Sequence, residues 1–263
     1  MQANRRHFTL SVAALAVAAA LPSVASAQSL DALKQKGKLV VGMLVDFPPF
    51  GILNSSNQPD GYDADVAKLL AKELGVAVEI VPVTGPNRIP FLLTNKVDAL
   101  VASLAITPER AKQVLFSKPY SAASIVLYGD AKTKIASAAD MKGLRIGVAR
   151  ASTQDVAVTK AAPEGTNIRR FDDDASAMQA LLSGQVDAIG CSLQVAAEIA
   201  KRVPAGRFEN KFQLLQQNMA VAMRPNQDEL ASAVNAAIDK LIANGELNQL
   251  YKKWIGSDLP QLG

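Results

Sequence analysis

Residues 103–112, which read SLAITPERAK, contain a cation where a helix favours an anion. Thr107 is suited to be a hydroxyl N-cap and Pro108 to the first helical position, so a helix is predicted to begin here. Arg110 then places a positive charge in the first turn, where the helix dipole is already positive. A long arginine side chain can reach away into water at little cost. The alternative is that an external anion completes a site at Arg110.

A second candidate anion site begins at Ser152. Ser152 and Asp155 have the spacing of a capping box, which by itself explains an ordinary helix start. The preceding apolar run, however, predicts a strand that aims the backbone N–H groups of Ser152 and Thr153 at the end of a sheet, and helix N-termini in that position bind anions. One carboxylate could then satisfy both this helix and Arg110.

The scarcity of histidine and cysteine excludes several classes of chemistry. The only histidine is His7 and the only cysteine is Cys191. His7 lies in a predicted export signal, so the mature chain has no Ser-His-Asp or Cys-His system and no His/Cys zinc site. Cys191 has no internal disulfide partner and is expected to be a buried apolar residue. No cofactor or metal is expected.

The N-terminus has the basic, apolar and small-residue regions of an export signal, with cleavage expected after Ala27. Arg5 and Arg6 also suggest the twin-arginine route. The apolar stretch is too short for a confident membrane span, so the mature chain is expected to be soluble and periplasmic. Removing the signal leaves a net charge of +2, and no basic run interleaves with aromatic residues, so no nucleic acid partner is expected.

The apolar periodicity predicts an α/β fold with mostly parallel sheets. The first half alternates strands and helices, at residues 37–44, 61–75, 76–83, 87–96 and 97–102. The second half begins again, at residues 140–149, 152–162, 172–185 and 186–191. Residues 225–256 are predicted to be helical with a break at Gly245.

Residues 92–103 and 181–192 resemble each other, as LLTNKVDALVAS and LLSGQVDAIGCS. Ordinary helix-to-strand joints explain this similarity. The alternative is two similar lobes, in which Ser103 and Ser192 lie at the carboxyl ends of strands, where open α/β sheets bind ligands. Without a flexible linker, the chain would cross between the lobes in ordered strands near residues 123–129 and 218–223, which predicts a hinge.

Several motifs together resemble the extracellular solute-binding proteins, family 3, of amino-acid ABC importers. The strongest are TPER at 107–110 and FSKPY at 116–120, and the resemblance extends in order over residues 38–256. It implies a two-lobed, type II periplasmic-binding-protein-like fold. Lobe 1 would comprise residues 28–124 and 219–263, and lobe 2 residues 125–218. The implied partners are a small solute and a membrane ABC permease, with the receptor a monomer.

The resemblance also implies ligand contacts. Arg110 matches the arginine that pairs with the ligand carboxylate, and Thr153 with Ser152 matches the helix N-terminus that binds the same group. Three further residues match other contacts in the family: Phe47, an aromatic that covers the ligand or packs in the core; Ser103, a small polar contact; and Arg88, which in the acidic-amino-acid branch meets a second carboxylate.

The chain departs from the family at its negative positions. Ser192 stands where many members have the aspartate that binds the ligand ammonium, and Leu44 where some have a second acid. Asp46 is a possible substitute. We therefore expect a cleft with excess positive charge and a ligand that is either an amino acid held by other contacts or a carboxylate without an ordinary α-ammonium.

The predicted function is a periplasmic receptor for a small carboxylate-bearing solute, without catalytic activity. A sensing role would use the same features. The alternative is an enzyme resembling cyclohexadienyl dehydratases, which share the scaffold. Such an enzyme needs a proton donor in the cleft, for which Asp46 is the only candidate from the sequence.

Overall fold

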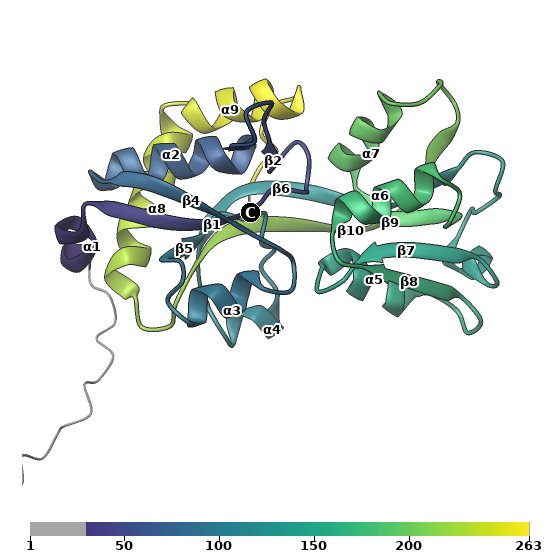
Figure 1. Cartoon of the computed structure of the whole chain (residues 1–263), viewed down its shortest axis with the longest axis horizontal. Coiled ribbons are helices and arrows are strands. Elements are labelled where there is room, and N and C mark those ends of the chain that lie inside the picture. Colours follow the sequence, from purple (N-terminus) through teal and green to yellow (C-terminus); the bar gives the residue numbers. More distant parts are fainter. Residues whose placement is uncertain (1–29, 263) are drawn as a thin grey trace, which may run out of the picture.

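The computed structural model describes residues 30–262 of the 263-residue chain. Two lobes lie side by side, and two long strands run from one to the other (Figure 1). The export signal predicted up to Ala27 lies outside the described residues. Within residues 30–262, no helix has the length and apolar character needed to cross a bilayer.

The first lobe is built on three parallel strands with helices around them. Strand β1 (Lys38–Leu44) pairs with β4 (Ala77–Val83) on one side and β5 (Ala99–Leu100) on the other. After Lys38 every residue of β1 is buried, as expected for a strand covered on both faces. The remaining elements of this lobe are α1 (Leu30–Lys36), the hairpin β2 (Ile52–Leu53) and β3 (Pro59–Asp60), α2 (Tyr62–Leu74), α3 (Arg88–Leu93), α4 (Pro108–Ala111), α8 (Asp228–Ala243) and α9 (Glu246–Ile255).

The second lobe repeats this pattern. Strand β7 (Arg145–Ala149) pairs in parallel with β8 (Asn167–Phe171) and β9 (Ala188–Ser192). Its helices are the 3-10 turn η1 (Ala138–Met141), α5 (Thr153–Ala161), α6 (Asp174–Leu182) and α7 (Leu193–Ala200). Cys191 is buried in β9, which confirms the expectation from the sequence.

The strands β6 (Leu115–Asp130) and β10 (Phe208–Met223) connect the lobes. They pair antiparallel along their length and complete one eight-stranded sheet with the order β4-β1-β5-β10-β6-β9-β7-β8. The crossings predicted near residues 123–129 and 218–223 lie within these two strands. Two ordered strands that connect the lobes are the arrangement that the predicted hinge requires, and the hinge motion stays a prediction.

Most predicted elements are present, but three are clearly shorter than expected: the strand predicted over residues 97–102 spans only Ala99–Leu100, the helix predicted over 172–185 spans Asp174–Leu182, and the helix predicted over 87–96 spans Arg88–Leu93. Helix α2 ends before Gly75, whose φ of 74° gives the left-handed C-cap that favours glycine. Gly245, with φ 79°, separates α8 from α9 as predicted. The helix predicted over residues 87–96 ends at Leu93, because Thr94 donates its hydroxyl to the Pro90 carbonyl and Asn95 turns left-handed with φ 59°.

Candidate functional site

A cleft between the lobes brings together seven of the eight predicted ligand-binding residues. Its cavity holds about 20 Å³, enough for one water molecule. The predicted residues that line it are Asp46, Phe47, Arg88, Ser103 and Arg110 from lobe 1 and Ser152 and Thr153 from lobe 2. The two lobes therefore meet at these residues.

Arg110 turns its guanidinium back toward the cleft. Thr107 is the N-cap of α4 and accepts from the Arg110 backbone N–H at 3.2 Å, as the sequence predicts. The guanidinium donates from Nη1 to the Ala105 carbonyl at 3.0 Å and from Nη2 to the Ala151 carbonyl at 3.1 Å. Burial, followed by the charge of Arg88, lowers the pKa of Arg110 to about 9. Arg110 is thus a partly desolvated cation at the meeting point of the lobes.

Arg88 is a second cation at the same place. Its side chain is buried and donates to the Ala102 carbonyl at 3.1 Å and to the Ala151 carbonyl at 3.3 Å. Among residues 30–262, neither Arg88 nor Arg110 forms an ion pair with an acidic side chain within 4 Å. A buried and a half-buried guanidinium that share one neutral carbonyl can bind an anion strongly.

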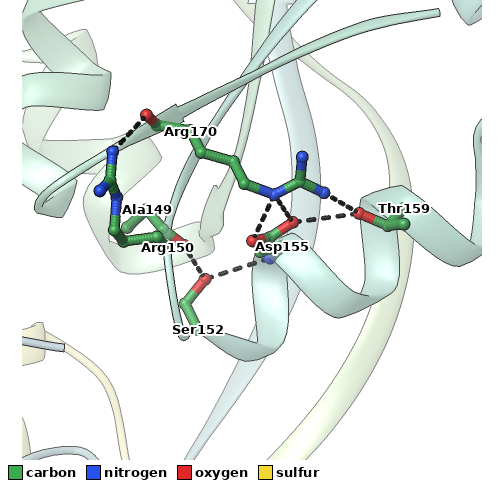
Figure 2. A network of polar contacts seen from close by, with 6 residues as sticks. All are labelled: Ala149, Arg150, Ser152, Asp155, Thr159 and Arg170. Carbon is green, nitrogen blue, oxygen red and sulfur yellow. Dashed lines mark hydrogen bonds and ion pairs between the residues drawn. The ribbon is translucent and has the colours of Figure 1, made fainter. Parts of the chain in front are cut away.

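A hydrogen-bond network around Ser152 and Asp155 holds the N-terminus of α5 (Figure 2). The Ser152 hydroxyl donates to the Ala149 carbonyl and accepts from the Asp155 backbone N–H at 3.1 Å. Asp155 does not complete a capping box, because its carboxylate accepts instead from Arg170 Nε at 2.8 Å and from the Thr159 hydroxyl at 3.0 Å. The first turn of α5 is therefore rigidly presented to the cleft.

The strand β10 also contributes to the cleft. The Thr153 hydroxyl hydrogen-bonds to the side-chain oxygen of Gln217. Gln217 lies in the part of β10 that runs between the lobes and lines the cavity. The predicted site did not include Gln217, because its only sequence signal is one polar residue in an alternating strand.

Four aspartates also line the cavity: Asp46, Asp172, Asp173 and Asp174. Asp46 comes from lobe 1, while Asp173 and Asp174 begin α6 in lobe 2. Asp173 is occupied as the N-cap and accepts from the Ser176 backbone N–H at 2.6 Å. Asp174 accepts from Gln154 Nε2 at 3.0 Å. Within the described chain, the buried Oδ1 of Asp46 has no hydrogen-bond donor.

The electrostatics of these acids reflects burial and mutual repulsion. Burial and then the charge of Asp173 raise the pKa of Asp46 to about 6. Burial and then the charge of Asp46 raise the pKa of Asp174 to about 7, although Arg88 acts in the opposite direction. A cation between these carboxylates would relieve both effects. The lining contains four aspartates, Asp172 among them, and three arginines, Arg150 among them, so the expectation of a cleft with excess positive charge is wrong.

The two serines of the sequence repeat have different places. Ser103 lines the cavity, but its hydroxyl points away from it and donates to Asp63 at 2.7 Å. Ser192 is fully buried outside the lining, and its hydroxyl caps α7 by accepting from the Val195 N–H at 3.1 Å. The similarity of residues 92–103 and 181–192 is thus a repeat of backbone structure, not of the cleft surface.

Phe47 combines the two roles considered from the sequence. It lines the cavity, yet its side chain is buried and stacks on Phe50 with ring centroids 5.4 Å apart.

From the sequence, the acids at 172–174 are predicted only as part of a helix. Their signal was present, since three consecutive acids directly after a strand are the sort of group that the end of a sheet presents to a ligand.

Comparison with known proteins agrees with this geometry. The model of the bacterial extracellular solute-binding proteins, family 3, matches residues 39–257. The chain belongs to this family. As a family 3 solute-binding protein it has the two-lobed type II fold, and the site lies where its two lobes meet.

Named relatives of this family 3 protein are binding proteins for amino acids. The L-cystine-binding protein TcyJ of Escherichia coli is 29% identical over 94% of this chain and 93% of its own. The glutamine-binding protein GlnH of Bacillus subtilis is 32% identical over 88% and 85%.

Solved structures of other binding proteins also resemble this chain over most of its length. A mutant of ArgBP from T. maritima superposes with a TM-score of 0.80 at 30% identity, over 87% of this chain and 99% of that one. The ancestral amino acid-binding protein AncCDT-1, described as a precursor of cyclohexadienyl dehydratase, superposes with a TM-score of 0.78 at 35% identity, over 86% and 98%.

Proposed function

We propose that this protein is a receptor that captures an amino acid between its lobes and delivers it to a membrane ABC permease. The observation that carries the proposal is the presence of both charge types in one cleft. Arg88 and Arg110 suit a carboxylate, and Asp46 and Asp174 suit an ammonium. A solute without charged groups, or with only one of the two charge types, would leave the groups of one sign uncompensated.

The carboxylate would lie between Arg110 and the first turn of α5. Arg110 offers a planar set of donors, and the backbone N–H groups near Ser152 and Thr153 add the positive end of a helix. The ammonium would then reach Asp46 and Asp174, with Phe47 covering the apolar part. Ser192 has no part in this arrangement because it is fully buried and does not line the cavity.

The proposal also includes the export of the protein, the cleavage of its signal and the boundaries of its lobes. The signal would be cleaved after Ala27 and the mature monomer would act in the periplasm, with Arg5 and Arg6 directing twin-arginine export. Lobe 1 would comprise residues 28–124 and 219–263, and lobe 2 residues 125–218, so that both boundaries lie within β6 and β10. The N-terminus of the exported protein, determined by mass spectrometry, tests the cleavage site.

An enzymatic function is a second candidate. Asp46 and Asp174, with pKa values of about 6 and 7, have the character of proton donors, and AncCDT-1 is described as a precursor of an enzyme. We favour binding because TcyJ and GlnH, which cover nearly the whole chain, are named as binding proteins. Turnover of a cyclohexadienyl acid by the purified protein would overturn this preference.

A set of matched ligands tests the receptor function. The three amino acids in the names of the relatives, L-cystine, L-glutamine and L-arginine, are titrated by calorimetry together with the α-keto acid and the decarboxylated amine of each. We expect one amino acid to bind at least about tenfold more tightly than both of its analogues. Equal affinity for an amino acid and its keto acid would contradict the ammonium site, and equal affinity for the amine would contradict the carboxylate site.

A further inference from the structure

A closed triangle of hydrogen bonds lies directly behind the cleft. The Ser103 hydroxyl donates to Asp63 Oδ2 at 2.7 Å, and the Tyr120 hydroxyl donates to Asp63 Oδ1 at 2.8 Å. The Ser103 backbone N–H donates to the Tyr120 hydroxyl oxygen at 3.1 Å. Asp63 on α2 and Tyr120 on β6 have no exposed surface, so neither can contact a solute. Each of the three residues is bonded to the other two.

The triangle holds Ser103 in an unfavourable backbone conformation. Its φ of 46° lies in the left-handed region, which is unfavourable for a residue with a side chain. A carboxylate at full burial is also unfavourable, and burial raises the pKa of Asp63 to about 7. Such strain persists only where the surroundings enforce it, and it is typical of ligand-binding loops.

The backbone on either side of Ser103 holds both cleft arginines. The carbonyl of Ala102, one residue before Ser103, accepts from Arg88 Nη1 at 3.1 Å. The carbonyl of Ala105, two residues after it, accepts from Arg110 Nη1 at 3.0 Å. A rotation of the backbone at Ser103 would therefore turn these two carbonyls and move both guanidiniums.

We propose that Asp63 and Tyr120 are positioning residues for ligand binding, which act on Arg88 and Arg110 through Ser103. The proposal rests on the proposed function, because it assigns the two arginines to the ligand. It differs from ordinary core packing in one respect. Removing the Tyr120 hydroxyl disturbs the direction of the arginines, whereas removing a neighbouring hydroxyl of equal burial does not.

Tyr62 provides the matched control. It is as buried as Tyr120, its ring stacks on Tyr120 with centroids 6.1 Å apart, and its hydroxyl donates to the Tyr120 backbone carbonyl at 2.8 Å. Tyr62→Phe and Tyr120→Phe each remove one buried hydroxyl from the same cluster. Only Tyr120→Phe removes a contact to Ser103.

The experiment compares ligand affinity with stability in the two variants. We expect denaturant unfolding to show a similar loss of stability in both. Calorimetry with L-cystine, L-glutamine and L-arginine is expected to show a Kd raised by about tenfold or more in Tyr120→Phe and by less than about twofold in Tyr62→Phe. Equal losses of affinity, or a Tyr120→Phe affinity within about twofold of wild type, would overturn the proposal.

Hydrogen exchange separates this proposal from the proposed function, because it needs no ligand. In Tyr120→Phe, the backbone amides of residues 103–105 are expected to exchange faster than in Tyr62→Phe. If wild type binds none of the three amino acids, the proposed function fails. The exchange result still shows whether the Tyr120 hydroxyl holds the backbone at Ser103. Unchanged exchange at residues 103–105 in Tyr120→Phe would overturn the positioning role.

Discussion

Arg110 of lobe 1 donates from Nη2 to the backbone carbonyl of Ala151 of lobe 2, over 3.1 Å. The same carbonyl accepts from Arg88 at 3.3 Å, and Ala151 adopts a left-handed φ of 58° to present it. A carbonyl oxygen has a partial negative charge, whereas a carboxylate oxygen has a full one. We therefore expect a ligand carboxylate to replace this carbonyl as the shared acceptor of both arginines.

Arg110→Ala is expected to weaken amino-acid binding by about tenfold to a hundredfold. Hydrogen bonds to charged groups contribute about 1.5 to 3 kcal/mol, and tenfold in Kd corresponds to about 1.4 kcal/mol. The unliganded variant should remain folded, because the lost side chain is a partly desolvated cation repelled by Arg88. Calorimetry and thermal unfolding check both parts. Arg110→Lys should recover only part of the affinity, since lysine cannot pair bidentately.

Asp174→Asn is expected to weaken binding of an amino acid but not of its α-keto acid, because the variant removes a partner of the ammonium alone. Asp172→Asn is the matched control, since Asp172 also lines the cavity but is exposed and paired with Arg150 at 3.2 Å. Competition titrations with the two ligand classes measure the ratio of affinities. The same ratio in both variants would exclude Asp174 as an ammonium partner.

Affinity for an amino acid is expected to rise between pH 5 and pH 8. The groups involved are Asp46 and Asp174, with pKa values of about 6 and 7, together with Asp173 and Arg88 beside them. A bound ammonium favours the ionised carboxylates and lowers their pKa values, so binding releases protons in this range. Calorimetry in buffers of different ionisation enthalpy counts these protons. Proton uptake would contradict the prediction.

Without ligand, the free energy of unfolding is expected to fall over the same pH range in which the affinity rises. A carboxyl group whose pKa is raised by folding holds a proton in the native state that the unfolded state, with a pKa of about 3.9, has lost. The stabilisation from Asp174 is thus present below about pH 4 and is lost as the pH rises through about 7. Urea unfolding at pH 5 and pH 8 should show that wild type loses more stability than Asp174→Asn.

Ligand binding is expected to require opening and reclosing of the lobes. The cavity of about 20 Å³ is too small for an amino acid, and Thr153 contacts Gln217 at its edge. A ligand at about one hundred times its Kd should add roughly 2.7 kcal/mol to the free energy of unfolding. Because a ligand can enter only an open form, we expect the lobes of the ligand-free protein to be apart more often in solution than those of the liganded protein, so small-angle scattering should show a smaller radius of gyration with ligand than without. An equal radius in both states would contradict closure on binding.

Local features of the site were predictable from the sequence. The cap at Thr107, the helix start at Ser152 and the buried Cys191 follow from residues within a few positions of each other. Capping, helix periodicity and apolar runs are interactions of near neighbours, so their signals survive in a single sequence. The motifs around Arg110 and the terminal helices likewise indicated the family.

The charge balance of the cleft depended on tertiary structure. Asp46 and Asp174 belong to different lobes, and only the sheet order that places β6 and β10 in the middle brings them together. The same is true of Arg110 and the Ala151 carbonyl, which are 41 residues apart. The sequence alone determined which polar groups the chain has and which helices they begin. Packing decided which of these groups face one another and left Ser192 outside the cleft. Pairings between residues so far apart in the sequence depend on the fold of the whole chain.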